Sequence, residues 1–333
     1  MPIKEPELLV GVNAGLNGIH TILLREEADG RLRLIGEHRD RQVVQKSDEM
    51  VFLRRIKESI ENGLVDANVS LADILAIGVA LPGQIDMDGG TVVFSPVFNM
   101  KEHSFPFVAR LHEYLDVPHI ALIGDHDAQG ISEKRIGMGK ETRDLVYLHI
   151  GHGVEASIIF KEELYTGANN LAGAFGHTIV DLNGPKCTCG NRGCLNAIVS
   201  RSAIEEKLMQ RYKEGETTIL ASELNKEPLN INLVVIAEAI DLADSLTCRV
   251  VEEVAEVLGI GIANIINFLN PQRVILGGDI IDEIDLFFDK AIESAKKRSL
   301  QANLSNVSIV HGMLGAAAGV YGAAIFAKWH LSQ

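Results

Sequence analysis

Three of the four cysteines in this 333-residue chain lie close together, and a histidine precedes them. His177, Cys187, Cys189 and Cys194 form the pattern H-x9-C-x-C-x4-C. Zinc prefers four nitrogen or sulfur ligands in a tetrahedron, and three thiolates with one imidazole meet that requirement. Four protein ligands leave no open position, so the pattern predicts a structural zinc rather than a catalytic one. The alternative is three buried thiols and an unrelated histidine; Cys248 is expected in a helix core.

The segments that must position this cluster alternate between strands and helices. Strands are predicted at Leu8 to Asn13 and Ile19 to Glu26, with a third after the turn at residues 28–30. A second group of strands begins at Leu145 to Ile150 and Ala156 to Phe160. The same order of strands followed by helices therefore occurs twice, which indicates an α/β protein with two similar halves. Two such halves would place a small-ligand cleft between them.

Helices are predicted from apolar spacing and capping residues. Ser47 is expected to cap a helix whose apolar residues recur every four positions from Phe52 to Leu64. Two later helices are expected at Asp241 to Leu258 and Gly261 to Leu269. The Ala- and Gly-rich segment from Met313 to Trp329 is shorter than the ~20 apolar residues of a membrane span, so a closely packed helix is predicted.

The overall composition excludes several classes of protein. The chain is 47% hydrophobic and 23% charged, with a formal net charge of −14. This charge argues against direct, sequence-independent nucleic-acid binding, which requires a basic surface. The first residues, MPIKEPELLV, do not resemble a secretion signal, so disulfides are not expected. A cytoplasmic protein without a membrane segment is predicted.

Four segments resemble a known family. GHTIVDLNGPKCTCGNRGC (176–194) is similar to the zinc signature of the ROK family, which groups bacterial sugar kinases with sugar-responsive repressors. Residues 81–96, 164–177 and 270–280 resemble its inter-domain segment, its sugar-site approach and its late nucleotide-side loop. The resemblance extends from about Leu8 to about Ala327, nearly the whole chain.

This resemblance implies an actin-like ATPase fold, with two RNase H-like domains around a central cleft. We expect an N-terminal domain of residues 1–122, completed by a C-terminal helix at about 318–333. Residues 123–317 would form the second domain, which carries the zinc loop. By analogy with the family, a homodimer or homotetramer is expected.

The resemblance also assigns a catalytic base. Family kinases end a strand in an Asn-Asp pair, in which the aspartate takes the proton of the sugar hydroxyl. Here Asp127 occupies that position and His126 replaces the asparagine, a pairing closer to the repressor branch. Both residues are therefore candidates for sugar binding. From the sequence alone, Asp127 could equally cap the next helix.

The phosphate-binding turns depart from the kinase pattern. Where kinases read Asp-x-Gly-Gly-Thr, this chain has Asn13, which lacks the charge that helps to hold Mg²⁺, and Leu16. The second turn carries Glu155, whose carboxylate would repel a triphosphate. Asp279 follows the late glycine pair. The candidate nucleotide-binding residues, which could equally form ordinary turns, are Asn13, Gly15, Gly151, Gly153, Gly277 and Gly278.

The sugar site is altered as well. The resemblance places His177, Asn196 and, by a loose alignment, Asn99 against the sugar, although Asn99 could be a turn residue. Two glutamates of the family are replaced, one by Ala174 and the other by Asn196. Asn196 can still donate and accept hydrogen bonds, whereas Ala174 cannot. Either the ligand differs from glucose or the site binds sugar more weakly.

Three classes of function remain open. The favoured hypothesis is a sugar-sensing, regulator-type protein with a degraded ATP site and little or no kinase activity. Family repressors carry a helix-turn-helix ahead of the sugar domain, and only about seven residues precede the first strand here. The alternative is a kinase for a hexose or N-acetylhexosamine that uses Asp127 as general base and ATP-Mg²⁺ as phosphoryl donor. A purely structural role is the third class.

Overall fold

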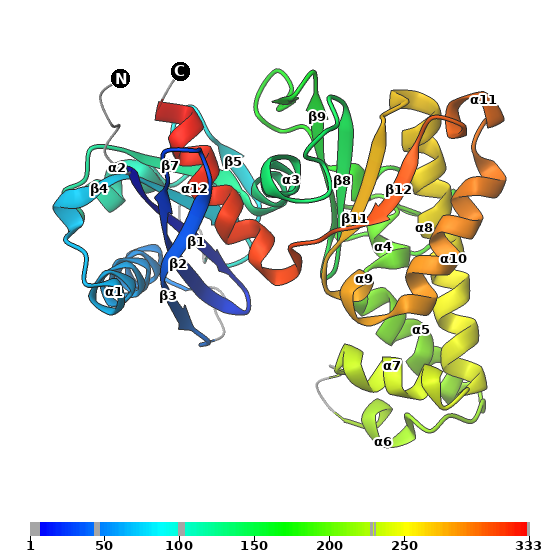
Figure 1. Cartoon of the computed structure of the whole chain (residues 1–333). Coiled ribbons are helices and arrows are strands. Elements are labelled where there is room, and N and C mark those ends of the chain that lie inside the picture. Colours follow the sequence, from blue (N-terminus) through cyan, green and yellow to red (C-terminus); the bar gives the residue numbers. More distant parts are fainter. Residues whose placement is uncertain (1–6, 43–46, 99–103, 227–228, 230, 332–333) are drawn as a thin grey trace. The chain divides into compact units, whose positions relative to one another are not determined.

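Two five-stranded sheets form the framework of the chain in the computed structural model (Figure 1). The structure describes residues 7–42, 47–98, 104–226, 229 and 231–331. The chain separates into two compact units. Unit 1 contains residues 1–136, 164–172 and 317–333, and unit 2 contains residues 137–163 and 173–316.

The sheet of unit 1 has the order β3-β2-β1-β4-β7. Strands β1 (Glu7–Gly15), β2 (Gly18–Glu26) and β3 (Leu32–Asp40) form an antiparallel meander. Strands β4 (Ile74–Leu81) and β7 (Ile120–Gly124) extend it in parallel with β1. The central strands are buried almost throughout, in agreement with the continuous apolar runs of their sequences.

Helix α1 (Glu49–Ala67) covers one face of this sheet. Its cap is Asp48, whose carboxylate accepts hydrogen bonds from the amides at the helix start, and not Ser47 as the sequence indicated. The backbone of Ser47 is instead committed to a bridge with Phe98. The hydroxyls of Thr21 on β2 and Ser59 on α1 lie 2.7 Å apart, which joins the sheet and the helix.

The opposite face of the sheet is covered by α12 (Ala318–Leu331). Gly11 and Gly78 are neighbours on β1 and β4, and the helix backbone rests on both. A Cβ added to Gly78 would lie 1.8 Å from the Ala323 carbonyl oxygen, and one added to Gly11 would lie 2.1 Å from that of Val320. The Ala- and Gly-rich composition of this segment therefore reflects close packing on the sheet.

The sheet of unit 2 repeats the same plan in the order β10-β9-β8-β11-β12. Strands β8 (Leu145–Ile150) and β9 (Val154–Phe160) are antiparallel, and β10 (Glu163–Leu164) follows them. Strands β11 (Arg273–Gly277) and β12 (Ser308–His311) continue the sheet in parallel with β8. The duplicated order is the one expected for two RNase H-like units.

Helix α8 (Ser245–Leu269) runs without a break where the sequence indicated two helices. Gly259 and Gly261 do not end it; they allow neighbouring segments to approach. A Cβ at Gly259 would lie 2.3 Å from Ser294 of α10 (Asp285–Arg298), and α8 and α10 pack along each other in Figure 1. The predicted start at Asp241 falls instead at the end of α7 (Leu233–Asp241).

The remaining elements are short, apart from α3 and α5. Those in or beside unit 1 are η1 (Leu71–Asp73), β5 (Gln84–Asp86), β6 (Thr91–Phe94), α2 (Phe107–His112) and α3 (Asp125–Ile136). Those in unit 2 are η2 (Phe175–His177), α4 (Asn196–Val199), α5 (Arg201–Lys213), α6 (Ala221–Leu224), α9 (Asp279–Glu283) and α11 (Gln301–Leu304). The 3₁₀ turn η3 (Gly315–Ala317) precedes α12.

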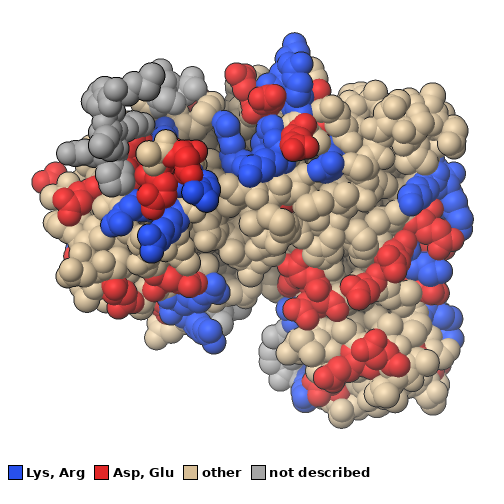
Figure 2. Space-filling model, viewed as in Figure 1, with Lys and Arg blue, Asp and Glu red and all other residues tan. Residues whose placement is uncertain are grey.

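Each unit has its own hydrophobic core, in which the described strands pack against the helices that cover them. On the face drawn in Figure 2, acidic and basic side chains lie in small groups among uncharged residues, and no extended basic surface is visible. Within the part of the chain that the structure describes, no helix is long and apolar enough to span a membrane.

Candidate functional site

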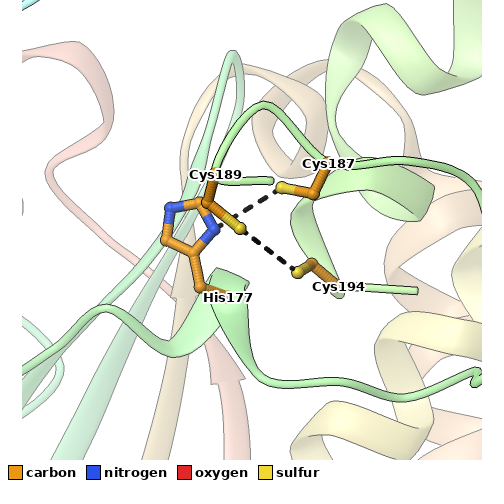
Figure 3. Close-up of side chains that lie close together, drawn as sticks. All are labelled: His177, Cys187, Cys189 and Cys194. Atoms are coloured by element: carbon orange, nitrogen blue, oxygen red, sulfur yellow. Dashed lines mark hydrogen bonds between the residues drawn. The ribbon is translucent and has the colours of Figure 1, made fainter. Parts of the chain in front are cut away.

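The four residues of the cysteine pattern converge at one point of unit 2 (Figure 3). His177 ends η2, Cys187 and Cys189 lie on the following loop, and Cys194 lies just before α4. One ligand atom from each residue falls within 4.8 Å of all the others. Cys187 and Cys194 are buried, whereas His177 and Cys189 are exposed. Together these residues form a group that could hold a metal ion.

The distances within this group fit a tetrahedral ion. His177 Nδ1 and Cys187 Sγ lie 3.6 Å apart, and the Sγ atoms of Cys189 and Cys194 lie 3.7 Å apart. With Zn–S bonds of about 2.3 Å and Zn–N bonds of about 2.0 Å, the edges of a tetrahedron are about 3.8 Å between sulfurs and about 3.5 Å between nitrogen and sulfur. The spacing and the donor set therefore both suit zinc.

The loop that carries the cysteines is folded by its glycines and by backbone hydrogen bonds. Gly193 has a φ of 69°, and a Cβ at this position would lie 1.5 Å from the Asp181 carbonyl oxygen. The amide of Cys187 donates to the Asn191 carbonyl at 2.8 Å, and the amide of Gly193 donates to the Pro185 carbonyl at 2.8 Å. The local sequence thus imposes the tight curl that brings the thiols together.

The same loop is also held by packing against α8. A Cβ at Gly261 would lie 2.9 Å from the side chain of Leu195 and 3.3 Å from that of Phe175. These two residues are close in sequence to Cys194 and His177. The absence of a side chain at Gly261 therefore allows both ends of the loop to pack closely against α8.

The thiols in this group differ in acidity. Burial, followed by the thiols of Cys189 and Cys187, raises the pKa of Cys194 to about 12. The backbone amide of Asn191 is the largest of the effects that lower the pKa of Cys189. Thiolates packed this closely repel one another, and a divalent cation among them would offset that repulsion.

The proposed base belongs to unit 1. Asp127 and His126 lie in the first turn of α3, and both are largely buried. His126 Nε2 is 3.6 Å from Asp127 Oδ2, and its Nδ1 is 3.8 Å from Asp125 Oδ1. The imidazole therefore lies beside two carboxylates, at distances that allow an ion pair when the ring is protonated.

The first candidate phosphate turn is a tight hairpin. Gly15 pairs with Gly18, so that only Leu16 and Asn17 form the turn, and Leu16 packs against the core of unit 1. Asn13 points toward the start of α12, where a Cβ at Gly319 would lie 2.8 Å from its Nδ2. The end of β1 thus presents an amide, and not a carboxylate, to its surroundings.

The second turn joins β8 to β9. The Gly151 amide donates to the Gly153 carbonyl at 3.0 Å, and the Val154 amide donates to Asn196 Oδ1 at 3.0 Å. Asn196 is the first residue of α4 and follows the cysteine loop directly. The side-chain oxygen of this candidate sugar ligand therefore connects the cysteine loop to the glycine turn.

The late glycine pair directs an acidic side chain onto the same turn. Gly277 ends β11 opposite His149 of β8, and Gly278 leads into α9. Asp279 is the first residue of that helix, and its Oδ2 lies 3.9 Å from Nη1 of Arg201. Sequence reasoning missed Arg201; the only local signal is its i,i+4 pairing with Glu205.

The other candidate residues are distributed as follows. Asn99 lies outside the described residues. Ala174 precedes η2 and is exposed, and its carbonyl accepts from the amide of His177 at 3.1 Å. Of the sugar-site candidates, Asp127 and His126 are in unit 1, whereas His177 and Asn196 are in unit 2.

Comparison with known proteins gives relatives of two kinds. A xylose repressor of Caldicellulosiruptor bescii is 29% identical over 307 residues, which cover 92% of this chain and 74% of the repressor. A glucokinase of Thermotoga maritima is 29% identical over 294 residues, which cover 85% of this chain and 92% of that enzyme. Sequence similarity alone therefore does not separate a regulator from a kinase.

The fold agrees with these relatives. The crystal structure of a ROK family glucokinase from Streptomyces griseus, in complex with glucose and AMPPNP, matches with a TM-score of 0.81 at 24% identity. The match covers 97% of this chain and 99% of that glucokinase, and it confirms the expected α/β, actin-like fold. The model of the ROK family matches residues 10–330. This chain therefore belongs to the ROK family.

Proposed function

We propose that this protein is a sugar-binding, regulator-type ROK protein whose nucleotide site is degraded, with little or no kinase activity. The observation that carries this proposal is the negative charge at the glycine turns of unit 2. The carboxylate of Asp279 lies against Gly151. Glu155 on β9 lies opposite His149 in the pairing of β8 with β9. A like-charged pair about 4 Å apart costs about 4 kcal/mol at the effective dielectric of a protein surface, which opposes triphosphate binding.

A second feature supports the same conclusion from unit 1. Asn13, two residues before the end of β1, carries an amide where the resemblance to family kinases leads us to expect an aspartate. A neutral amide oxygen is a weaker ligand for Mg²⁺ than a carboxylate. The carboxylates at the turns of unit 2 repel the phosphates, and the missing carboxylate at Asn13 weakens Mg²⁺ binding in unit 1. Both changes disfavour binding of ATP-Mg²⁺.

The candidate sugar ligands are better preserved than the candidate nucleotide ligands. Asp127 and His126 keep a carboxylate and an imidazole within 3.6 Å of each other, and Asn196 retains its amide group near the cysteine loop. These groups can accept and donate hydrogen bonds to sugar hydroxyls. The exposed Ala174 contributes no such group, so the preferred sugar is expected to differ from glucose.

The alternative is an ATP-dependent kinase for a hexose or N-acetylhexosamine with Asp127 as general base. The observation in its favour is Asp127 itself, because its carboxylate is largely buried and lies beside His126. A general base must be held in a defined orientation, and these surroundings restrict the carboxylate in that way. If a kinase persists, we expect slow turnover and weak affinity for ATP.

A sugar screen tests the favoured function. Xylose and glucose, the sugars of the repressor and glucokinase relatives, and N-acetylglucosamine, an N-acetylhexosamine, are each added without nucleotide, and the melting temperature is measured. A ligand at a hundredfold excess over its dissociation constant stabilises the folded state by about 2.7 kcal/mol. We expect at least one sugar to raise the melting temperature of the wild type, and Asp127→Asn to abolish the shift.

Asp66→Asn is the matched control, because Asp66 is exposed near the end of α1. It should respond to the sugar as the wild type does. A coupled ADP-release assay on the same three proteins separates the two functions. Turnover at ordinary kinase rates that is lost in Asp127→Asn would favour the alternative and contradict the regulator-type function.

Three further properties are proposed with this function. The metal group is expected to hold a structural zinc that ROK members carry in their signature loop, and ATP-Mg²⁺ would be a cofactor only in the kinase alternative. A homodimer or homotetramer in the cytoplasm is expected by analogy with the family. Light scattering of the purified protein measures the assembly.

A further inference from the structure

The position of Asp279 is imposed by the residue before it. Gly278 has a φ of 102°, and a Cβ at this position would lie 2.4 Å from the Ile150 carbonyl oxygen. Only glycine is accommodated here, because the chain must cross closely over the end of β8 in a left-handed conformation. Because of this crossing, the Asp279 side chain lies beside the turn that begins at Gly151.

The carboxylate of Asp279 fills the space over that turn. A Cβ added to Gly151 would lie 2.6 Å from Asp279 Oδ1, so the carboxylate rests against the glycine backbone. Among the described residues, Oδ1 is buried and has no hydrogen-bond partner. A buried oxygen without a donor is unfavourable. The carboxylate is therefore held there by its connection to Gly278 and by nearby positive charge.

Arg201 supplies that charge from a fixed position. Its backbone amide donates to the Gly151 carbonyl at 2.9 Å, which ties the start of α5 to the turn. Its Nη2 donates to the Ile231 carbonyl at 2.7 Å, and its Nε donates to Glu205 Oε1 at 3.2 Å. Nη1 lies 3.9 Å from Asp279 Oδ2, an ion pair that is longer than a hydrogen bond.

We propose that Asp279 is a specificity-determining residue that excludes phosphate-bearing ligands from the turn at Gly151, because its carboxylate occupies the place of an anion beside Arg201. The inference rests on the proposed function and names the side chain that closes the nucleotide side of the site. A phosphate that enters would have to displace Asp279 and would then lie next to an unpaired carboxylate. Removal of the carboxylate leaves a glycine turn with an arginine beside it, which suits an anion.

A simpler account is that Asp279 only stabilises α9, because acidic residues are favourable in the first turn of a helix. The two accounts predict different results. A purely structural Asp279 changes the stability of the protein when it is replaced, whereas a residue that excludes anions changes the affinity for phosphate-bearing ligands.

The test is calorimetric titration of ADP, with and without Mg²⁺, and of inorganic pyrophosphate. The proteins are the wild type, Asp279→Asn, Asp279→Ser and the control Asp289→Asn, which removes the same charge from an exposed position on α10. We expect both Asp279 variants to bind ADP and pyrophosphate at least about tenfold more tightly than the wild type, and Asp289→Asn to be unchanged. Equal affinities in all four proteins, or an equal gain in the control, would overturn the proposal.

The double variant Asp279→Asn/Arg201→Gln examines the partner charge. We expect it to lose the gained affinity, and retention of the full gain would contradict the place assigned to Arg201. The sugar melting screen on the same samples reports on the proposed function separately. If no sugar shifts any of these proteins while Asp279→Asn still gains affinity for ADP, sugar sensing fails and the role of Asp279 stands.

Discussion

At the scale of single residues, Asp244 illustrates how one carboxylate can fasten several segments. Its Oδ1 accepts from the amide and hydroxyl of Thr247 at the start of α8 and from the hydroxyl of Thr218. Its Oδ2 accepts from the Ile219 amide at 3.0 Å. The residue therefore caps α8 and also ties the loop before α6 to it.

These hydrogen bonds make stability depend on pH. Burial is the largest single effect and acts to raise the pKa of Asp244, but the bonds from Thr247, Ile219 and Thr218 together bring the pKa below its ordinary value. A lowered pKa in the folded state contributes stability that is complete above the unfolded pKa of about 3.9 and is lost as the pH falls through the folded value.

We expect Asp244→Asn to lower the free energy of unfolding by about 1–2 kcal/mol at neutral pH, because an amide cannot accept all four bonds. The difference from the wild type should shrink below about pH 4. Urea denaturation across this range measures it, with Asp289→Asn as the control. A deficit that stays constant down to acid pH would contradict the charge-based explanation.

Cys187 allows a second test at this scale, because it is buried in the metal group and another cysteine can serve as its control. We expect about one zinc per chain in the wild type and much less in Cys187→Ser, with a loss of stability of about 3 kcal/mol or more, since loss of a metal is among the most destabilising changes. Elemental analysis and thermal melting measure both quantities.

Cys248→Ser is the matched variant, since Cys248 lies in α8 outside the group. It should keep its metal. Zinc that is absent from the wild type, or present equally in Cys187→Ser, would show that the thiols do not form the site.

Some of these residue-level features could be predicted from the sequence and others could not. The spacing of His177 and the cysteines predicts a shared site, because short loops rich in glycine can only bring such ligands together locally. The relation between Asp279 and Arg201 has no such signal, since the two residues lie on α9 and α5, which are far apart in the sequence and are brought together only by the tertiary fold.

At the scale of elements, apolar runs predict strands β1 to β3, β8 and β9, but the predicted helix boundaries are wrong at glycines and caps. The sequence predicts one helix that ends at Leu258 and another that begins at Gly261, yet α8 is continuous there, and Gly259 and Gly261 allow close packing against Ser294 and Leu195. A glycine in an isolated helix is unfavourable by about 1 kcal/mol, and only the tertiary contacts explain its presence. Sequence patterns do not distinguish these two uses of glycine.

The packing of α12 on its sheet gives a prediction at this scale. We expect Gly78→Ala to destabilise the protein by about 1–3 kcal/mol, because the new methyl group would overlap the Ala323 carbonyl oxygen and push the helix away. Denaturant unfolding measures the change.

Gly15→Ala is the comparison, because no atom lies within 4 Å of an added Cβ at that position. It should cost much less. Similar losses in the two variants would mean that loss of backbone flexibility, and not the contact with α12, sets the effect.

At the scale of the whole molecule, the duplicated plan could be predicted because the meander of β1 to β3 has a counterpart that begins at β8. The parallel pairing of β1 with β4 and of β8 with β11 depends on contacts between distant segments, which no local pattern encodes. Residues 164–172 belong to unit 1 although they lie between segments of unit 2. Here Asn170 donates to Asp88 at 3.0 Å, a contact without any sequence signal.

The path of the backbone through the two units limits how the protein can be divided. The chain changes unit at residues 136/137, 163/164, 172/173 and 316/317, so neither unit is a continuous stretch of sequence. A fragment that stopped at Ile136 would lack α12 and would leave the glycine-lined face of its sheet open to water. Such a fragment is expected to aggregate when expressed by itself. This face of the sheet can therefore be covered only after α12 has been synthesised.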